Sequence, residues 1–224
     1  MLNIVTWYYG DKYSPDYVSK LAAGVKRNLK QPYRFVVVSE NARIVGDGME
    51  SWPIVDEDLL KVPGCLARLR MFDPTWQAAH GIAKGERIVD LDIDMVITGA
   101  LDPLFDRPDP FVILQHINTT NPNPYNGSVF MLRAGERPDV WSDFSIEAST
   151  KIRYHAFPDD QGWFWHKIPD AGAWTVGDGI YGFKKVGWPT GDALPENARI
   201  VAFPGWRDPI KLGHLDWVAK HWVA

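Results

Sequence analysis

The first forty residues combine short apolar runs with a helical pattern. Residues 2–7 and 34–38 are compact runs rich in Val, Ile and Phe, which predict two buried strands. Between them, Ser14 and Pro15 predict the start of a helix, with Ser14 as its N-cap. The apolar stripe of this helix consists of Val18, Leu21, Ala22, Val25 and Leu29. The order strand, helix, strand predicts a parallel pair with a right-handed crossover.

Further strands and helices are predicted up to the C-terminus. We expect helices over residues 65–72, 138–148 and 159–168, and strands over residues 110–114, 128–132 and 200–203. Asp73 caps another predicted helix, which Gly81 ends. Residues 41–63 have no clear period, because glycines and a proline interrupt them. No internal repeat or linker divides the sequence, so we predict one α/β domain over residues 1–224.

One predicted strand carries three aspartates in an otherwise apolar segment. In residues 87–97, Asp90, Asp92 and Asp94 occupy alternate positions, so an extended backbone directs them to one face. Neighbouring carboxylates would lie ~6.6 Å apart and repel one another unless a cation or solvent neutralises them. Hard oxygen ligands of this kind suit Mg²⁺ or Mn²⁺. An edge strand with one wet face is the alternative, although the apolar flanks favour a central strand.

Composition and charge argue against several classes of protein. The chain has 224 residues, a formal net charge of −4 and scattered basic residues, which argues against nucleic-acid binding. Cys65 is the single cysteine, so no intrachain disulfide can form. The first residues lack the regions of a signal peptide, and no apolar run reaches the ~18 residues that span a bilayer. We therefore expect a cytoplasmic protein without a transmembrane segment.

The aspartate segment resembles a motif of a known enzyme group. Residues 90–97, with the turn at residues 99–105, are similar to the D-x-D segment of GT-A glycosyltransferases. The resemblance is closest to family 8, the glycogenin and lipopolysaccharide galactosyltransferase group, and suggests a divergent bacterial or phage relative. It implies a Rossmann-like GT-A fold with a mixed, mostly parallel central sheet. It also implies that Asp92 and Asp94 hold Mn²⁺ or Mg²⁺ against the diphosphate of a nucleotide-sugar, and that Asp92 touches the ribose or the sugar; Asp90 lies outside the motif.

Three further segments match this family in part. Arg68 matches a basic residue on the helix before the aspartate strand, which would pair with a phosphate or sugar oxygen. Asn126 lies in a segment similar to the strand that lines the sugar pocket, and is the candidate for hydroxyl recognition. Asp160 and Gln161 match an Asp-Gln pair near the reacting carbon and are the candidate catalytic residues. The residues alone also allow a surface arginine, an Asn-Gly turn and a helix cap at these positions.

The first strand supplies other candidates for binding the nucleotide-sugar. Ligands bind outside the carboxyl ends of the strands in open α/β sheets. Thr6, Tyr8 and Tyr13 lie at or beyond that end of the first predicted strand. We therefore include all three among the nucleotide-sugar-binding candidates.

Residues 201–211 resemble the closing loop of family 8. Ala202 stands where the family has a histidine that is the third metal ligand. Arg207 and Lys211 are candidates for the phosphate contact that the family makes through a lysine in this loop. His214 is a candidate for the missing metal ligand if the chain folds back over the diphosphate. Water in the metal shell, with a surface histidine at position 214, is the alternative.

The resemblance implies transfer of a hexose from a nucleotide diphosphate sugar, with UDP-hexose as donor and with retention. The acceptor is a glycan, a lipid-linked molecule or a protein, and the sequence does not define which. One alternative is a degenerate protein that binds the nucleotide-sugar without turnover, which the missing histidine motivates. Another is a nucleotidyltransferase, but these usually have a Gly-rich basic loop after the first strand. Residues 8–13 contain only Gly10 and Lys12 of that type.

Overall fold

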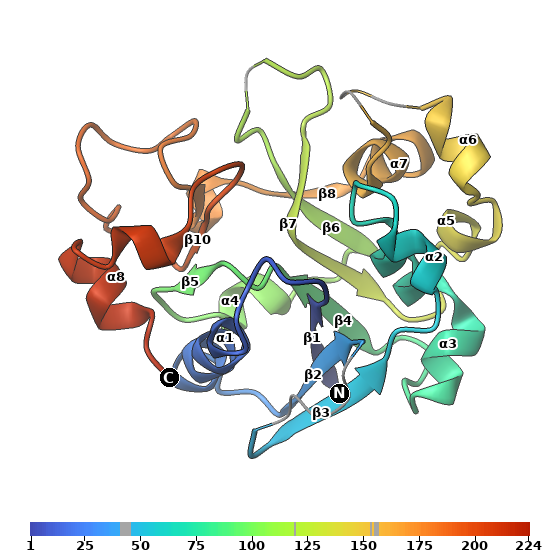
Figure 1. The fold of residues 1–224 in the computed structure, drawn as a ribbon, viewed down its shortest axis with the longest axis horizontal. Helices are drawn as coiled ribbons and strands as arrows, with labels where there is room; N and C mark the ends of the chain where they lie inside the picture. The colour runs from blue at the N-terminus through green and yellow to red at the C-terminus, as the bar shows by residue number, and fades with distance from the viewer. Residues whose placement is uncertain (41–45, 119, 153, 155–156) are drawn as a thin grey trace.

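A seven-stranded sheet forms the centre of the protein in a computed structural model, which describes residues 1–40, 46–118, 120–152, 154 and 157–224. The strand order is β3-β2-β1-β4-β7-β6-β8 (Figure 1). Only β7 runs antiparallel to its neighbours. The strands are β1 (Leu2–Tyr8), β2 (Tyr33–Ser39), β3 (Met49–Pro53), β4 (Arg87–Leu91), β6 (Phe111–Gln115), β7 (Tyr125–Arg133) and β8 (Gly172–Trp174). This mixed, mostly parallel sheet confirms the predicted fold class.

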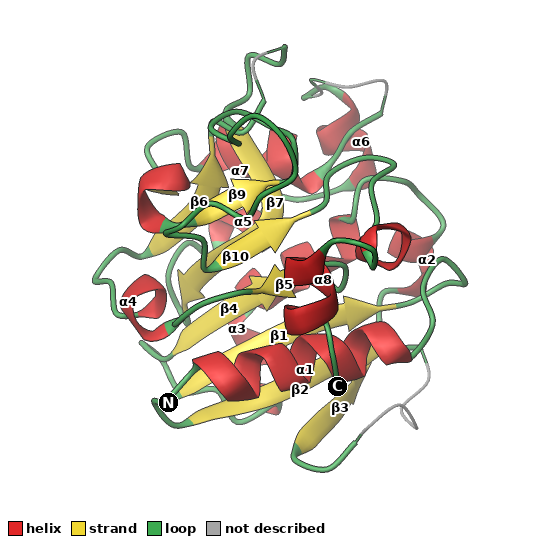
Figure 2. Ribbon diagram, turned by 90° about the vertical axis from the view of Figure 1, so that its left-hand side faces the viewer, coloured by secondary structure: helices red, strands yellow, loops and turns green. Residues whose placement is uncertain are grey.

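One face of the central sheet is covered by α1 (Asp16–Asn28) and by a smaller sheet of order β5-β10-β9 (Figure 2). Val18, Leu21 and Val25 of α1 are buried in this layer, as their spacing predicted. The predicted Ser14 cap was wrong, because Pro15 is the N-cap and no side chain caps the helix. The other elements on this side are β5 (Val96–Ile97), β9 (Ile180–Gly182), β10 (Ile200–Ala202), α4 (Asp102–Phe105), α8 (Asp216–His221), η2 (Val176–Asp178) and η3 (Pro209–Leu212).

Short helices cover the opposite face. They are α2 (Glu57–Leu60), η1 (Leu66–Phe72), α3 (Pro74–Ala79), α5 (Asp139–Ser142), α6 (Ile146–Thr150) and α7 (Asp160–Lys167). The rings of Phe72, Phe111, Phe130 and Phe164 meet in this layer, with centroids 5.0 to 5.9 Å apart. Offset aromatic contacts of this kind add specific geometry to apolar burial. The sheet is therefore buried on both faces, as a mostly parallel sheet must be.

Several predicted helices differ in detail from the observed ones. Residues 65–72 form the 3₁₀ helix η1, and its N-cap Cys65 adopts a left-handed conformation with φ 56°. Residues 138–148 form two helices instead of one, because Ser145 caps α6 separately by accepting from the backbone N–H of Ala148. The predicted Asp73 cap is confirmed, since its side chain accepts from the N–H of Thr75 at 2.9 Å. Within the described part of the chain, no helix has both the length and the apolar character needed to cross a membrane.

The sequence predicted that the three aspartates lie in one strand, and this was wrong. β4 ends at Leu91, and Asp92 and Asp94 belong to the turn that leads to β5. β4 nevertheless lies between β1 and β7, so the central-strand interpretation is confirmed and the edge-strand alternative is wrong. Asp90 is inside the strand, opposite Val5 and Phe130 of the neighbouring strands.

Candidate active site

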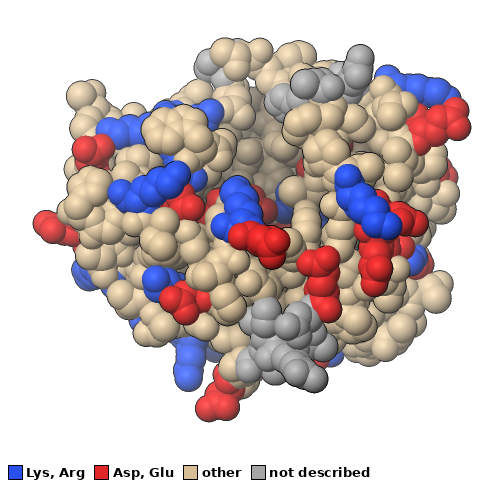
Figure 3. All heavy atoms as spheres, in the orientation of Figure 1, with Lys and Arg blue, Asp and Glu red and all other residues tan. Residues whose placement is uncertain are grey.

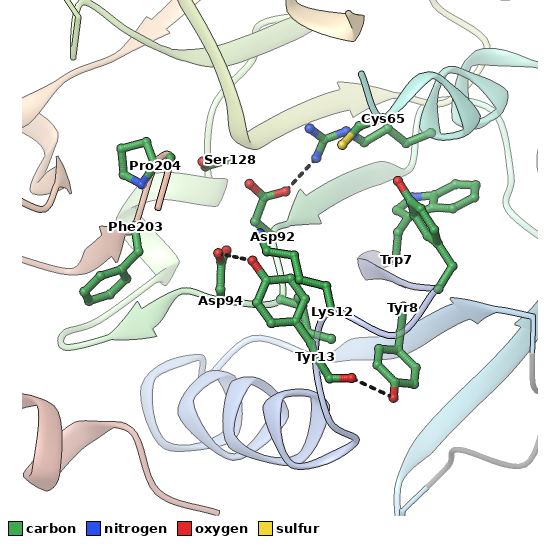
Figure 4. A pocket seen from close by; sticks show the side chains of 14 residues that line it. Trp7, Tyr8, Lys12, Tyr13, Cys65, Asp92, Asp94, Ser128, Phe203 and Pro204 are labelled. Carbon is green, nitrogen blue, oxygen red and sulfur yellow. Dashed lines mark hydrogen bonds and ion pairs between the residues drawn. The ribbon is translucent and has the colours of Figure 1, made fainter. Parts of the chain in front are cut away.

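A cavity of about 310 Å³ opens beyond the carboxyl ends of β1 and β4. Figure 3 shows the same face of the molecule hollowed near its centre, with charged side chains of both signs below the hollow. Figure 4 shows the side chains of the cavity wall. They belong to Trp7, Tyr8, Tyr9, Lys12, Tyr13, Cys65, Arg68, Asp92, Ile93, Asp94, Ser128, Phe203, Pro204 and Gly205. The position at strand ends is the one expected for a ligand site in an α/β fold.

Arg68 of η1 is the cation around which the carboxylates gather. Its Nη1 donates to Asp90 Oδ2 at 2.9 Å and to Asp92 Oδ1 at 2.8 Å. Its Nε donates to Asp160 Oδ2 at 2.5 Å. The Arg68 side chain is only 8% exposed, so these charge-assisted bonds form away from bulk water. The surface-arginine alternative for Arg68 was therefore wrong.

Two of these carboxylates are buried behind the cavity wall. Asp90 and Asp160 are each 1% exposed, and burial raises the pKa of each to about 7, against the opposing pull of Arg68. The pKa of Arg68 is raised, because the surrounding carboxylates outweigh the effect of its burial. Asp160 uses both oxygens, since Oδ1 accepts from the N–H of Gln161 at 2.8 Å. Asp160 therefore contacts the cavity-lining residue Arg68 but does not line the cavity itself.

Asp94 lines the same cavity and accepts a hydrogen bond from Tyr13. The Tyr13 hydroxyl donates to Asp94 Oδ2 at 2.5 Å, and the Tyr8 hydroxyl donates to the backbone carbonyl of Tyr13 at 3.1 Å (Figure 4). Burial, and then the charge of Asp92, raise the pKa of Asp94 to about 6, although the bond from Tyr13 lowers it. Burial and the charge of Asp94 raise the pKa of Tyr13 well above its ordinary value. Tyr13 is therefore a neutral hydrogen-bond donor in this site.

Asp92 and Asp94 are the carboxylates that fit a divalent cation. Both line the cavity, and the Asp92 side chain is 32% exposed. Burial and the neighbouring charge of Asp92 raise the pKa of Asp94 against the opposing charge of Lys12, so a cation placed between the two carboxylates would favour their ionised forms. Within the described residues, no group of three or more His, Cys, Asp or Glu side chains is placed to hold a metal ion. Two carboxylates suit Mg²⁺ or Mn²⁺, which take further ligands from phosphate and water.

Three other candidates, Thr6, Asn126 and Gln161, do not line the cavity. The Thr6 hydroxyl is buried and donates to the carbonyl of Leu91 at 2.8 Å, so Thr6 fixes the end of β4. Asn126 is 7% exposed inside β7, so the turn alternative was wrong; its side chain accepts from the N–H of Ser128 at 3.1 Å, where the pairing of β7 with β6 is irregular. Gln161 follows Asp160 in the first turn of α7.

The C-terminal candidates lie on a separate segment. Arg207 stacks on Trp206, with 5.2 Å between its guanidinium carbon and the ring centroid, just after the cavity residues Pro204 and Gly205. Lys211 is exposed in η3. His214 is exposed between η3 and α8 and does not line the cavity.

Two glycines are essential to this geometry and were not identified from the sequence. A Cβ at Gly127 would lie 2.7 Å from Arg68 Nη2 and 3.1 Å from Asp160 Oδ2. Gly64 has φ +101°, and a Cβ there would lie 2.2 Å from the carbonyl oxygen of Pro158. The Gly64 carbonyl also accepts from the N–H of Asp160 at 2.9 Å. The Asn-Gly pair at 126–127 was visible as a turn signal, but its neighbours come from distant segments.

Asp159 and Asp160 divide two tasks, as the sequence allowed. Asp159 caps α7 by accepting from the N–H of Gly162 at 2.7 Å. Asp160, one residue later, is directed to Arg68. The helix-cap interpretation is therefore correct for Asp159, and Asp160 belongs to the site.

Comparisons with known proteins agree with this architecture. No protein-family model matches the chain, and a comparison with curated proteins finds no match. A crystal structure of the galactosyltransferase LgtC with donor and acceptor sugar analogues is similar, with TM-score 0.63 and 14% identity over 99% of this chain and 97% of that chain. An active-site mutant of LgtC gives TM-score 0.62 and 15% identity over 92% and 89% of the two chains. At such identities the likeness establishes the fold alone, which is the GT-A fold.

Proposed function

We propose that this protein is a metal-dependent glycosyltransferase that moves a hexose from UDP-hexose to an acceptor, with retention of configuration. The observation that carries the proposal is the pair Asp92 and Asp94, which lie together in the wall of a cavity at the end of a central strand. The GT-A fold supports it, and LgtC, whose structure has this fold, is a galactosyltransferase. The acceptor class stays open among glycans, lipid-linked molecules and proteins.

In this proposal Asp92 and Asp94 hold Mn²⁺ or Mg²⁺, and the ion neutralises charge on the departing diphosphate. Lys12 lines the same cavity and adds a positive charge beside Asp94. Arg207 and Lys211 are the basic residues of the adjoining C-terminal segment that we assign to phosphate binding. Tyr8 and Tyr13 supply flat ring surfaces and hydroxyl groups for the nucleoside.

Arg68 and Asp160 act together on the donor sugar. Arg68 lines the cavity, and its orientation is fixed by Asp160 on one side. A fixed guanidinium can donate to a sugar hydroxyl without an entropy cost at the moment of reaction. Asp160 is therefore a positioning residue in this scheme, and Gln161 is the neighbouring polar group on α7.

The test is a comparison of binding with turnover. UDP and UDP-hexoses should raise the melting temperature in the presence of Mn²⁺, and UDP should be released slowly from UDP-hexose when water is the acceptor. Binding without UDP release would favour a protein that only binds nucleotide-sugars. The observation that favours this alternative is that both Asp160 oxygens already accept hydrogen bonds within the protein. Pyrophosphate release from a nucleoside triphosphate and a sugar phosphate would instead identify a nucleotidyltransferase. No binding of any nucleotide would refute the proposal.

A further inference from the structure

Asp90 is a carboxylate in a place where an apolar side chain is expected. It lies inside the central strand β4, next to Val5 of β1 and Phe130 of β7, and it is 1% exposed. In the described structure, its Oδ1 is buried without a hydrogen-bond partner, and Oδ2 accepts a single bond from Arg68. Burying a carboxylate costs several kcal/mol unless it is paired. Among the described residues, Arg68 is the cation that pairs with Asp90, at 2.9 Å.

Arg68 is held at two buried points and one exposed point. Asp160 accepts from Nε, and Asp90 accepts from Nη1; both carboxylates are 1% exposed. Asp92 shares Nη1 with Asp90, but its side chain is 32% exposed and lines the cavity. Of the three partners, Asp92 is therefore the one that a ligand can engage.

The two buried contacts are sufficient to fix a planar guanidinium. Nε and Nη1 donate from different edges of one rigid plane, so acceptors on both fix the orientation of the whole guanidinium. Nη2 has no hydrogen-bond partner among the residues that the structure describes, and it lies beside Gly127, where a Cβ would be only 2.7 Å away. The ring of Phe130 supports the group from below, 5.6 Å from the guanidinium carbon. The guanidinium of this cavity-lining residue is therefore held in one orientation by buried groups alone.

We propose that Asp90 is a positioning residue that keeps Arg68 in the cavity wall when Asp92 turns to a bound cation. This inference rests on the proposed function for the identity of that cation, a divalent ion with a nucleotide diphosphate. If Asp92 were the only acceptor for Nη1, cation binding would leave that nitrogen buried and unpaired, which costs about 1–3 kcal/mol. Asp90 limits this loss, because it continues to accept from one of the two Nη1 N–H groups, and the other faces the departing Asp92 at the cavity. Metal binding and sugar binding then do not compete for Arg68.

The experiment measures the mobility of the Arg68 guanidinium by ¹H–¹⁵N NMR, in protein without nucleotide or metal. Asp92→Asn imitates the withdrawal of the Asp92 charge, and the Arg68 Nη signals should stay as slowly exchanging as in the parent. In Asp90→Val/Asp92→Asn, rotation about the Arg68 Cζ–Nη bonds should become at least about tenfold faster. Asp90→Asn/Asp92→Asn should restore part of the slow exchange, because an amide oxygen still accepts from Nη1. Asp109→Asn, which alters a separate pair with Arg107, is the matched control and should leave Arg68 unchanged.

The outcomes separate this inference from the proposed function. Fast exchange in Asp92→Asn alone, or unchanged slow exchange in both double variants, would overturn the role of Asp90. If Asp90→Val/Asp92→Asn does not fold, the comparison of Asp90→Asn/Asp92→Asn with Asp92→Asn decides, and equal exchange rates in the two overturn it. A second series adds Mg²⁺ and UDP to the parent, where Arg68 should remain slow. Absence of UDP binding in that series would refute the proposed function and would leave the result of the variants standing.

Discussion

Arg68 changes how the aspartates of this chain should be understood. Taken from the sequence, Asp90, Asp92 and Asp94 form a row that needs an external cation. In the structure, Arg68 neutralises part of that charge from within, and Asp160 joins the same group. Of these carboxylates, Asp92 and Asp94 are the ones that line the cavity. Arg68 thereby divides the aspartates into a buried pair, Asp90 and Asp160, and a pair that lines the cavity, Asp92 and Asp94.

The first prediction concerns the metal-binding pair. Asp92→Asn and Asp94→Asn should each abolish Mn²⁺-dependent UDP binding, because each removes one of the two carboxylates that line the cavity. Isothermal titration calorimetry with UDP in the presence of Mn²⁺ measures the effect. Circular dichroism should show an unchanged fold in both variants. Parent-like UDP affinity in both would exclude the pair from metal binding.

The second prediction gives the sign of a pH effect in the metal-free protein. Burial and the Asp92 charge raise the pKa of Asp94 to about 6, so folding favours its protonated form. Its cost to stability is therefore present above that pH and disappears as the pH falls through 6 toward the unfolded value of about 4. In urea denaturation, Asp94→Asn should be more stable than the parent by up to about 2 kcal/mol at neutral pH. The difference should shrink as the pH falls below about 6 and vanish at about pH 3, below the unfolded pKa of about 4. A difference that is constant with pH would contradict this assignment.

The third prediction concerns the space beside Arg68. Gly127→Ala places a methyl group 2.7 Å from Nη2, so the guanidinium must move or the strand must shift. We expect a loss of about 1–3 kcal/mol in the free energy of unfolding and at least about tenfold slower UDP release from UDP-hexose. Gly213→Ala is the control, because its nearest neighbour would be 3.8 Å away and its φ of −60° suits alanine. Equal turnover in the two variants would show that Arg68 tolerates displacement.

At the scale of elements, the C-terminal segment is tied to α1 by a side-chain bond. The Tyr17 hydroxyl donates to Asp208 Oδ1 at 2.6 Å, and Asp208 is the N-cap of η3. Residues 203–205, just before this cap, line the cavity. The Tyr17 ring also packs on Trp222, with ring centroids 5.0 Å apart. The helix after β1 therefore positions one wall of a cavity whose other residues lie between positions 7 and 128.

The fourth prediction uses this connection. Tyr17→Phe keeps the ring contacts and removes the bond to Asp208, which should lower the free energy of unfolding by about 1 kcal/mol. UDP affinity should also fall, because the segment that carries Gly205 loses its attachment. Tyr181→Phe removes a comparable bond to Asn197, 2.7 Å in length, from a residue that does not line the cavity. It should reduce stability alone, and a similar affinity loss in both variants would argue against a specific role for Tyr17.

At the scale of the whole molecule, the apolar pattern predicted individual strands and helices but not the contacts between distant segments. β1, α1 and β2 were predictable because each buries a continuous run or stripe of its own residues. Of the smaller sheet, β10 was predicted as a strand, but its pairing with β5 and β9 was not, because these strands are two or three residues long and come from distant parts of the chain. The partners of Arg68 were equally hidden, since they lie 22, 24 and 92 residues away. Site residues could be nominated from the sequence, but their contacts required the fold.

The last prediction separates the stability of the fold from its proposed function. Two apolar layers hold the central sheet, and their buried residues include the strand interiors and the helices on both faces. Removal of metal with EDTA should therefore leave the circular dichroism and the urea midpoint of the protein unchanged. UDP at about a hundredfold excess over its dissociation constant should add about 2.7 kcal/mol to the free energy of unfolding when Mn²⁺ is present. In EDTA the same concentration of UDP should add no stability, and added Mn²⁺ should restore the gain.

The control variant Asp92→Asn should gain no stability from UDP in either buffer. UDP stabilisation that persists in EDTA would establish metal-independent binding, and unfolding by EDTA alone would instead reveal a structural metal.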